Sequence, residues 1–526
     1  MTIPVPPFRL VARLAAPFLV IFLATSPRPA LGQGYICAEG GGGVNRGDWV
    51  SPIFEWMVTS AREGMKTNGR ELRQPLVVVL GSRDDDAPGD PQDKPPEGSD
   101  HTLSRFVSAG AAASADLWVT AANADTDATY ATIAGADIIW MRGGDQSRYV
   151  KFWKGTKTEG AIREVFKKGG VVGGTSAGCA VLGQVIYDAL GGSAYSTDVL
   201  ADGRSPKITM TTGFLGLTPG VIFDTHFTER TRITRLAVML GQCQLDRRPI
   251  FLGVGVDTRT AVCISPDGMA EVRGQGAATV VFLTGESDVV LEAGKPPVVT
   301  NISYMQCVAG DRFSTRLPDR FCPHHNELPS PLNSGPVRPG WPAGGIERLA
   351  LKGDDDASAE HGCVRVEPTE RPNALLDGEL KVRPGTGRLP GFVVQPQTFD
   401  STTHDENRFG GGVWALASHP GACNGGIFLS TGCDAAVEPD GKMRVSSWGE
   451  RPLSALLLDT SRACVFDFAQ SKTNSESAGP RQAVGLEGAR LHVLAPGWGY
   501  DLAKHRVLPP EKATTNEQAT PVGAGK

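Results

Sequence analysis

Ser176 is surrounded by small residues in the pentapeptide Gly174-Thr175-Ser176-Ala177-Gly178. This G-x-S-x-G spacing is typical of a nucleophile elbow, a tight strand-to-helix turn that exposes the serine Oγ above a sheet. The alternative is an ordinary N-cap serine in a glycine-rich turn. If Ser176 attacks a carbonyl carbon, the rest of the chain must supply a general base and donors for the oxyanion.

A histidine that could act as the base follows an apolar run. His226 comes three residues after the run 221–223, and Asp224 lies between them. A histidine at the carboxyl end of a strand is well placed for general base catalysis, because its neutral imidazole accepts a proton near pH 7. A surface histidine near a helix start is the alternative.

A second loop offers backbone donors. Gly143 and Gly144 follow the apolar run 136–141 and leave the backbone free to turn N–H groups toward a ligand. The N–H groups of Gly144 and Ala177 are therefore our candidates for an oxyanion hole. A simple strand-to-helix turn is the alternative.

Short apolar runs alternate with helical patterns between residues 74 and 257. Runs that are apolar throughout are typical of parallel strands covered by helices on both faces. The expected strands cover 75–80, 117–120, 136–141, 170–174, 221–223 and 249–256, and the expected helices include 161–168 and 229–240. The pattern predicts an α/β domain with a mostly parallel sheet flanked by helices, whose ligands bind beyond the carboxyl ends of the strands.

The chain of 526 residues is long enough for two or three domains. We expect the α/β domain to cover 33–322, a Pro- and Gly-rich linker to cover 323–345, and a smaller β-leaning region to cover 346–506. Residues 507–526 have the composition of a disordered tail. The acidic, proline-rich segment 82–100 is expected to be a solvated loop.

The N-terminus resembles an export signal. Arg9 and Arg13 precede the apolar run 14–24, and residues 30–32 resemble a small-x-small cleavage site. The apolar run is shorter than a membrane span. We therefore predict a signal peptide at 1–32 and a secreted protein, extracellular or periplasmic, with a retained N-terminal anchor as the alternative.

Composition excludes some functions. The net charge is only −5 and no long basic run occurs, which argues against nucleic acid binding. No other stretch is long enough to span a membrane. Ten cysteines in an exported chain predict disulfides, although their pairing cannot be deduced from the sequence. His324 and His325 beside Cys322 are typical of linker sequence rather than of a zinc site, so we expect no metal there.

Three motifs occur in order between residues 74 and 264: GGDQ-x-R, G-T-S-A-G and D-x-H-F-x-x-R-x-R-x-x-R. Together they resemble cyanophycinase and its relatives in the dipeptidase E group of serine peptidases, peptidase family S51. The resemblance implies a class I glutamine amidotransferase-like, flavodoxin-like fold and a serine exopeptidase that needs no cofactor. The substrate it implies is cyanophycin, a polyaspartate whose side-chain carboxyls carry arginine, and the implied products are β-aspartyl-arginine dipeptides.

The resemblance also assigns roles to residues. Ser176 matches the nucleophile and His226 the base, so hydrolysis would pass through an acyl-enzyme. The residues that match substrate-binding positions are Gln146, Asp224, Thr225, Arg230, Arg232 and Arg235. An aspartyl-arginine substrate offers carboxylates that arginines can bind and a guanidinium that an acid such as Asp224 can bind. Surface ion pairing is the alternative role for these arginines.

Two positions depart from the family pattern. Thr225 stands where a glutamine is common, and Thr258 stands where a glutamate is expected to orient the base. Asp257 is adjacent but points to the other side of an extended strand. Which group orients His226 is therefore left open: another acid serves, the pair is a weakened dyad, or the domain is inactive. The alternatives to a cyanophycinase are accordingly a peptidase of other aspartyl peptides and a catalytically weakened binding homologue. A homodimer is the candidate assembly.

Overall fold

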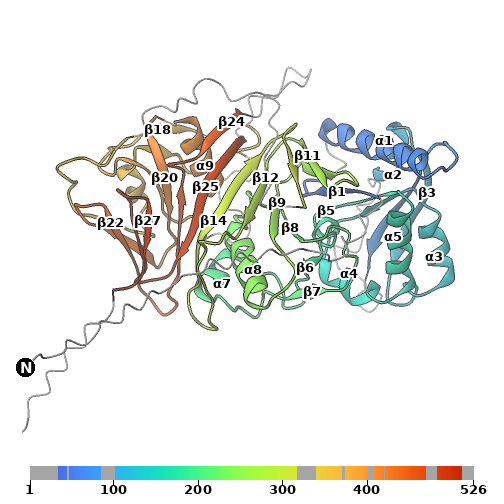
Figure 1. Cartoon of the computed structure of the whole chain (residues 1–526), viewed down its shortest axis with the longest axis horizontal. Coiled ribbons are helices and arrows are strands. Elements are labelled where there is room, and N and C mark those ends of the chain that lie inside the picture. Colours follow the sequence, from blue (N-terminus) through green and yellow to red (C-terminus); the bar gives the residue numbers. More distant parts are fainter. Residues whose placement is uncertain are drawn as a thin grey trace, which may run out of the picture. The chain divides into compact units, whose positions relative to one another are not determined.

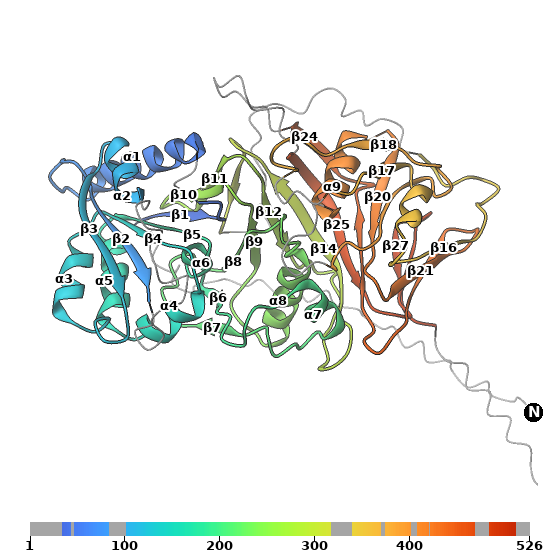
Figure 2. The same ribbon diagram turned by 180° about the vertical axis from the view of Figure 1, so that it is seen from behind.

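The computed structural model describes residues 34–43, 47–83, 101–316, 339–369, 374–400, 408–419, 421–468 and 483–511. Contacts within the chain group residues 32–526 into one compact unit. Figures 1 and 2 show its elements from opposite sides. The predicted signal peptide at 1–32 and most of the predicted linker and acidic loop lie outside the described residues. Among the described helices, none combines the length and the apolarity that a membrane span requires.

The first sheet has eight strands in the order β15-β11-β10-β1-β5-β4-β2-β3. The five strands from β1 to β3 in this order are parallel, and the other three are added antiparallel. The bounds are β1 Tyr35–Glu39, β2 Leu76–Ser82, β3 Ala112–Val119, β4 Ile138–Met141, β5 Val171–Thr175, β10 Thr260–Ile264, β11 Met269–Gly274 and β15 Arg312–Ser314. An α/β fold is therefore confirmed at this coarse level.

Helices cover both faces of this sheet (Figure 1). Val77 and Val79 of β2 pack in one cluster with residues of α1 and α2, whereas Val78 and Leu80 pack in another with residues of α4 and α5. This alternation explains why the run is apolar throughout, since the side chains of residues 77–80 face one helix layer or the other. The bounds are α1 Ser51–Thr67, α2 Thr102–Ser108, α3 Asp127–Ala134, α4 Gln146–Trp153 and α5 Lys157–Lys167.

A second sheet, of ten strands, runs across the predicted domain boundary. Its main order is β19-β20-β23-β25-β14-β12-β9-β8, while β13 pairs with β14 and β24 with β25. Val493 of β25 stands opposite Val299 of β14, so strands from both sides of the predicted linker 323–345 share one sheet. The bounds are β8 Val221–Thr225, β9 Leu252–Val256, β12 Ala278–Phe282, β13 Val289–Val290, β14 Val298–Cys307, β19 Gly391–Gln395, β20 Cys423–Phe428, β23 Ala455–Asp459, β24 Cys464–Phe468 and β25 Val484–Leu494.

The strands β8 and β9 belong to a different sheet from the one that the sequence analysis predicted. The apolar runs at 221–223 and 249–256 do form a parallel pair, but this pair belongs to the second sheet. Our expectation that they continue the first parallel sheet is therefore wrong. In the first sheet, β10 pairs with the edge of β1 that these strands were expected to extend. An apolar run indicates that a strand is buried, but it does not indicate which strand pairs with it.

The remaining helices are α6 Ala177–Ala180, α7 Ser196–Ala201, α8 Ile233–Leu245, α9 Arg408–Ser418 and the 3₁₀ turns Asp48–Val50 and Asp356–His361. The smaller sheets contain β6 Val185–Tyr187, β7 Met210–Thr212, β16 Leu349–Leu351, β17 Val364–Val366, β18 Val382–Pro384, β21 Cys433–Val437, β22 Lys442–Ser447, β26 Gly499–Asp501 and β27 Arg506–Leu508. The helix expected from residue 229 begins only at Ile233, because Thr231 has a φ of 47°, which an α-helix excludes. The first residues of the expected tail, 507–526, lie in β27.

The nine described cysteines form no disulfide. The Sγ atoms of Cys363 and Cys423 lie 2.8 Å apart, and Cys37 stands opposite Cys263 across β1 and β10. The disulfides expected for an exported chain stay a prediction, for which these two pairs are the candidates.

Candidate active site

Ser176 lies on a strained turn between β5 and α6. Its φ of 52° and ψ of −113° are uncommon for a residue with a side chain. The turn passes close to the end of β4, because a Cβ on Gly178 would lie 2.3 Å from the Met141 carbonyl oxygen. The Ser176 N–H donates to the Glu39 carbonyl at 3.0 Å and ties the turn to β1. Small neighbours thus allow a conformation that holds the hydroxyl at the carboxyl end of the sheet.

His226 reaches this hydroxyl from the other sheet. The short helix α6 lies between β5 and β8 (Figure 2), so the ends of the two strands come together. The Nε2 atom of His226 lies 2.9 Å from the Ser176 Oγ. The His226 N–H donates to the Gly40 carbonyl at 2.9 Å, and a Cβ on Gly41 would lie 2.2–2.7 Å from three atoms of the imidazole ring. Only a glycine at residue 41 therefore leaves room for the ring.

Glu229 places a carboxylate beside His226, whereas Thr258 stands at the position where the resemblance leads us to expect a glutamate. Its Oε1 lies 3.0 Å from the Nδ1 of His226, and the Oγ1 of Thr258 lies 3.2 Å from the same nitrogen. The Thr258 N–H donates to the other Glu229 oxygen at 3.4 Å. The sequence analysis missed Glu229, although it stands only three residues after the histidine. Asp257 bonds elsewhere, because its carboxylate accepts the N–H groups of Thr228 and Ala277, each at 3.0 Å.

Burial and pairing set the protonation of this chain of groups. Burial lowers the pKa of His226 below 6.5, although the hydrogen bond and charge of Glu229 oppose this shift. Burial acts to raise the pKa of Glu229, but the hydrogen bond and charge of His226, a backbone hydrogen bond and the charge of Arg230 together outweigh it and leave the pKa lowered. At neutral pH the imidazole is thus uncharged and the carboxylate is ionised. With its proton on Nδ1 facing Glu229, the imidazole presents Nε2 as an acceptor to Ser176.

The glycine loop before α4 lies beside the serine. A Cβ on Gly143 would lie 3.3 Å from the Ser176 Cβ, and Gly144 has a φ of 129°. Ala177 is the first residue of α6, so its N–H has no acceptor within that helix. The loop and the helix start therefore flank the hydroxyl, where an oxyanion would form.

Asp224 and Arg235 bind each other. The Arg235 Nε donates to the Asp224 Oδ2 at 2.7 Å, the guanidinium also bonds the Oδ1, and it stacks on the Tyr187 ring at 4.6 Å. Both residues are buried, with exposed fractions of 2% and 3%. In this geometry the two side chains satisfy each other in the protein interior. Direct contact of either residue with a substrate stays a prediction.

The other predicted binding residues are more open. Arg230 is exposed and makes no hydrogen bond or ion pair within the described part of the chain. Arg232 is partly buried and donates to the Thr225 carbonyl at 2.6 Å and to its hydroxyl at 3.2 Å. The Gln146 Nε2 lies 3.5 Å from the Tyr187 carbonyl, a long contact that a ligand could displace.

Residues of the C-terminal half contact the loops that hold the imidazole. A Cβ on Gly410, in α9, would lie 2.3 Å from the Cγ2 of Thr228, the neighbour of Glu229. Asp377 forms an ion pair of 3.2 Å with Arg259, which follows Thr258. Nothing in the sequence pattern pointed to these contacts.

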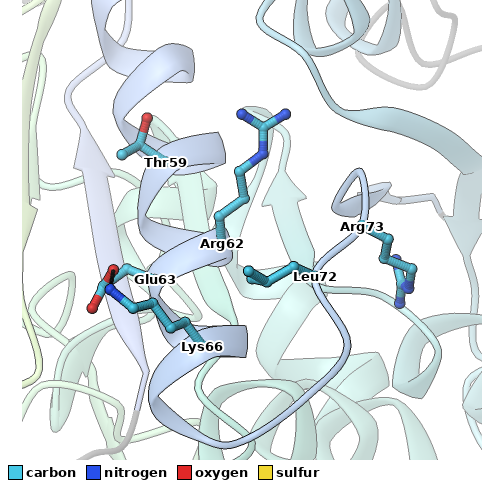
Figure 3. A pocket seen from close by; sticks show the side chains of 6 residues that line it. All are labelled: Thr59, Arg62, Glu63, Lys66, Leu72 and Arg73. Carbon is cyan, nitrogen blue, oxygen red and sulfur yellow. Dashed lines mark ion pairs between the residues drawn. The ribbon is translucent and has the colours of Figure 1, made fainter.

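One cavity lies away from this site. It has a volume of about 410 Å³ and is lined by Thr59, Arg62, Glu63, Lys66, Leu72 and Arg73 (Figure 3). Its charges are already engaged, because Arg62 bonds the Gly110 carbonyl, Arg73 pairs with Asp137 and Lys66 with Glu63. None of the residues discussed above lines it. Within the described residues, no group of three or more His, Cys, Asp or Glu side chains could hold a metal ion.

Comparisons with known proteins match the segment of the chain that carries most of these residues. Residues 114–272 match the family model described as Peptidase family S51. The resemblance to peptidase family S51 is confirmed. Ser176, His226, Glu229 and Thr258 all fall within the S51-like segment 114–272, whereas Glu39 and Gly410 fall outside it.

Curated relatives cover the same part of the chain. A cyanophycinase of Trichormus variabilis is 33% identical over 190 residues, which are 35% of this chain and 58% of the relative. A cyanophycinase of Geminocystis herdmanii is 34% identical over 187 residues, 34% of this chain and 62% of the relative. The chain thus spans about three fifths of the length of these relatives. A solved peptidase structure from an acI-B1 Actinobacterium is 16% identical and covers 54% of this chain and 98% of its own, but its TM-score of 0.35 is too low to carry an argument.

Proposed function

We propose that this protein is a serine-type peptidase that hydrolyses aspartyl peptides, with cyanophycin as the first substrate to test. One observation carries the proposal: the Ser176 hydroxyl, the His226 imidazole and the Glu229 carboxylate form a continuous hydrogen-bonded chain. The strained serine turn and the similarity to S51 peptidases and cyanophycinases support it. A catalytically weakened homologue is less favoured, because Glu229 supplies the charge that Thr258 cannot.

Acyl transfer follows from this arrangement. The Nε2 of His226 takes the hydroxyl proton while the Ser176 Oγ bonds to the substrate carbonyl carbon. The N–H of Ala177 and those of the 143–144 loop bind the oxyanion, and Glu229 stabilises the imidazolium. The imidazolium then protonates the leaving amine as the C–N bond breaks. A water molecule that gives its proton to Nε2 attacks the ester, and its oxygen leaves with the substrate acid as Ser176 regains its proton.

Unpaired positive charge beside the histidine favours an anionic substrate. Arg230 lies four residues after the base and has no partner within the described residues, so it is free to bind a carboxylate. Gln146 and Arg232, which match substrate-binding positions in the resemblance, would orient the chain of the substrate. This favours an aspartyl peptide, and release of β-aspartyl-arginine dipeptides by exopeptidase action is part of the proposal. Because the Thr225 hydroxyl is bound to Arg232, another aspartyl peptide is the second candidate substrate.

Digestion of purified cyanophycin tests the proposal. The protein should release dipeptides, and Ser176→Ala should abolish the release. Arg230→Gln should lower kcat/KM by about ten- to a hundredfold, the effect of losing one charge-assisted hydrogen bond, with little change for a neutral ester. Unchanged hydrolysis by Ser176→Ala would refute the assignment of the nucleophile, and a preference for neutral peptides would refute the substrate class.

Location and assembly belong to the proposal as well. The predicted export signal at 1–32 supports an extracellular or periplasmic location for the enzyme. A homodimer stays a prediction.

A further inference from the structure

Glu39 is a buried acid that the proposed mechanism does not use. It is the last residue of β1 and its exposed fraction is 0%. Its Oε1 accepts the N–H of Gly41 at 2.8 Å, whereas its Oε2 has no hydrogen-bond partner within the described residues. In the part of the chain that the structure describes, no lysine or arginine pairs with it. A carboxyl group in such a place normally has a function or is kept uncharged.

Glu39 connects the two ends of the reacting pair. Its backbone carbonyl accepts the Ser176 N–H at 3.0 Å, and its side chain holds the N–H of Gly41. Gly41 in turn lies against the imidazole of His226. The Glu39 carboxyl thus fixes the glycine turn that supports one face of the base.

Burial outweighs the two hydrogen-bond donors that would stabilise a negative charge on Glu39. Burial, with a smaller contribution from the charge of Glu229 in the loop after β8, raises the pKa of Glu39 to about 8, although the Thr175 hydroxyl on β5 and the bound glycine N–H act to lower it. The thiols of Cys37 on β1 and Cys179 on α6 also face it, and burial holds the pKa of each well above its usual range. The acid is therefore protonated at neutral pH, and these thiols stay neutral beside it.

We propose that Glu39 is a positioning residue whose uncharged carboxyl holds Gly41 against the imidazole of His226, and that loss of its proton turns the site off at alkaline pH. This inference rests on the proposed function. An ionised Glu39 would be a buried charge repelled by the Glu229 carboxylate, and no cation pairs with it in the described part of the chain, so it would draw in water and release the glycine turn. The imidazole would then lose its alignment with Ser176.

The pH profile of Glu39→Gln tests the inference, because glutamine keeps the acceptor for Gly41 and cannot ionise. For the full chain, kcat/KM on cyanophycin should fall about tenfold for each pH unit above 8. The profile of Glu39→Gln should remain flat in that range. Glu39→Leu, which lacks the acceptor, should lose kcat at every pH. Glu55→Gln, on the exposed face of α1, is the matched control and should follow the parent.

Asp257 needs a separate variant. Burial, with the charge of Glu229, raises the pKa of Asp257 to about 7, so it titrates close to the same range. If the alkaline decline persists in Glu39→Gln but disappears in Asp257→Asn, the inference is overturned. It is also overturned if the decline persists in both.

Thermal unfolding distinguishes a failed inference from a failed function. The unfolded chain loses the Glu39 proton near pH 4.5, whereas the folded chain keeps it to about pH 8. Stability should therefore fall between these pH values in the parent, and Tm of Glu39→Gln should rise relative to the parent over the same interval. This shift is expected even if no peptide is cut. Absence of the shift would overturn the inference regardless of activity.

Discussion

Two side chains hold the Nδ1 of His226, and they are not equivalent. The Thr258 hydroxyl can fix the orientation of the ring, but it cannot balance the charge of an imidazolium. The Glu229 carboxylate does both from a position three residues along the chain. The acid is thus supplied by the loop after β8 instead of the loop after β9.

Glu229→Gln should therefore lower kcat by about a hundredfold to ten-thousandfold, with KM almost unchanged, because the charge matters only when the imidazolium forms. The carboxylate also raises the pKa of His226, so its removal should shift the acid limb of the kcat/KM profile to lower pH. Steady-state kinetics across pH 5–8 measures both effects. Thr258→Val is the control, and a larger loss in Thr258→Val than in Glu229→Gln would contradict this division of roles.

Among the secondary-structure elements, α9 has an unexpected connection to the site. Its Gly410 packs against Thr228, whose N–H also donates to Asp257. The neighbouring residue Gly411 faces Val366 and Leu380 instead. One helix of the C-terminal half thus presses on the turn that carries Glu229.

Gly410→Ala should lower kcat at least tenfold, because the added Cβ would lie 2.3 Å from the Thr228 side chain and displace the turn. Gly411→Ala is the matched control, since its Cβ would lie 2.9 Å from Val366 and its nearest neighbours include no atom of the turn. Both variants should lose about 1–3 kcal/mol of stability through overpacking, partly offset by the helix preference for alanine. Equal kcat values per folded molecule in the two variants would show that α9 does not position the site.

For the whole molecule, the ten-stranded sheet joins the S51-like segment to the C-terminal half. β25 covers β14 along most of its length, and β23 continues the sheet beyond it. Ile302 and Tyr304 of β14 are buried in the same cluster as Leu491 and Val493 of β25. The two halves therefore share one hydrophobic core.

A chain that ends at residue 316 should consequently fail to fold, because β14 would expose its apolar face and an unpaired edge. Soluble yield, size-exclusion chromatography and thermal unfolding measure this. A chain that ends at residue 511 keeps every described strand and serves as the control. A soluble 1–316 fragment with a cooperative transition near that of the full chain would contradict the prediction.

Short motifs in the sequence were sufficient to nominate Ser176 and His226, to indicate helices on both faces of a parallel sheet, and to suggest peptidase family S51. This is because turn chemistry and burial are properties of a few adjacent residues: small neighbours permit the strained serine turn, and an apolar run reports burial on both faces. The motif spacing also placed arginines near the base, but it could not distinguish the free Arg230 from Arg235, which pairs with Asp224.

Only the tertiary structure decided which groups surround the imidazole. Glu229, Thr258 and the Glu39–Gly41 turn come from three separate segments, and no periodicity relates them. The partners of β8 and β14 were equally hidden, because an apolar strand can pair with any neighbour of suitable register. These features depend on long-range packing, because the role of a side chain is set by neighbours that are distant in the sequence and close only in the folded protein.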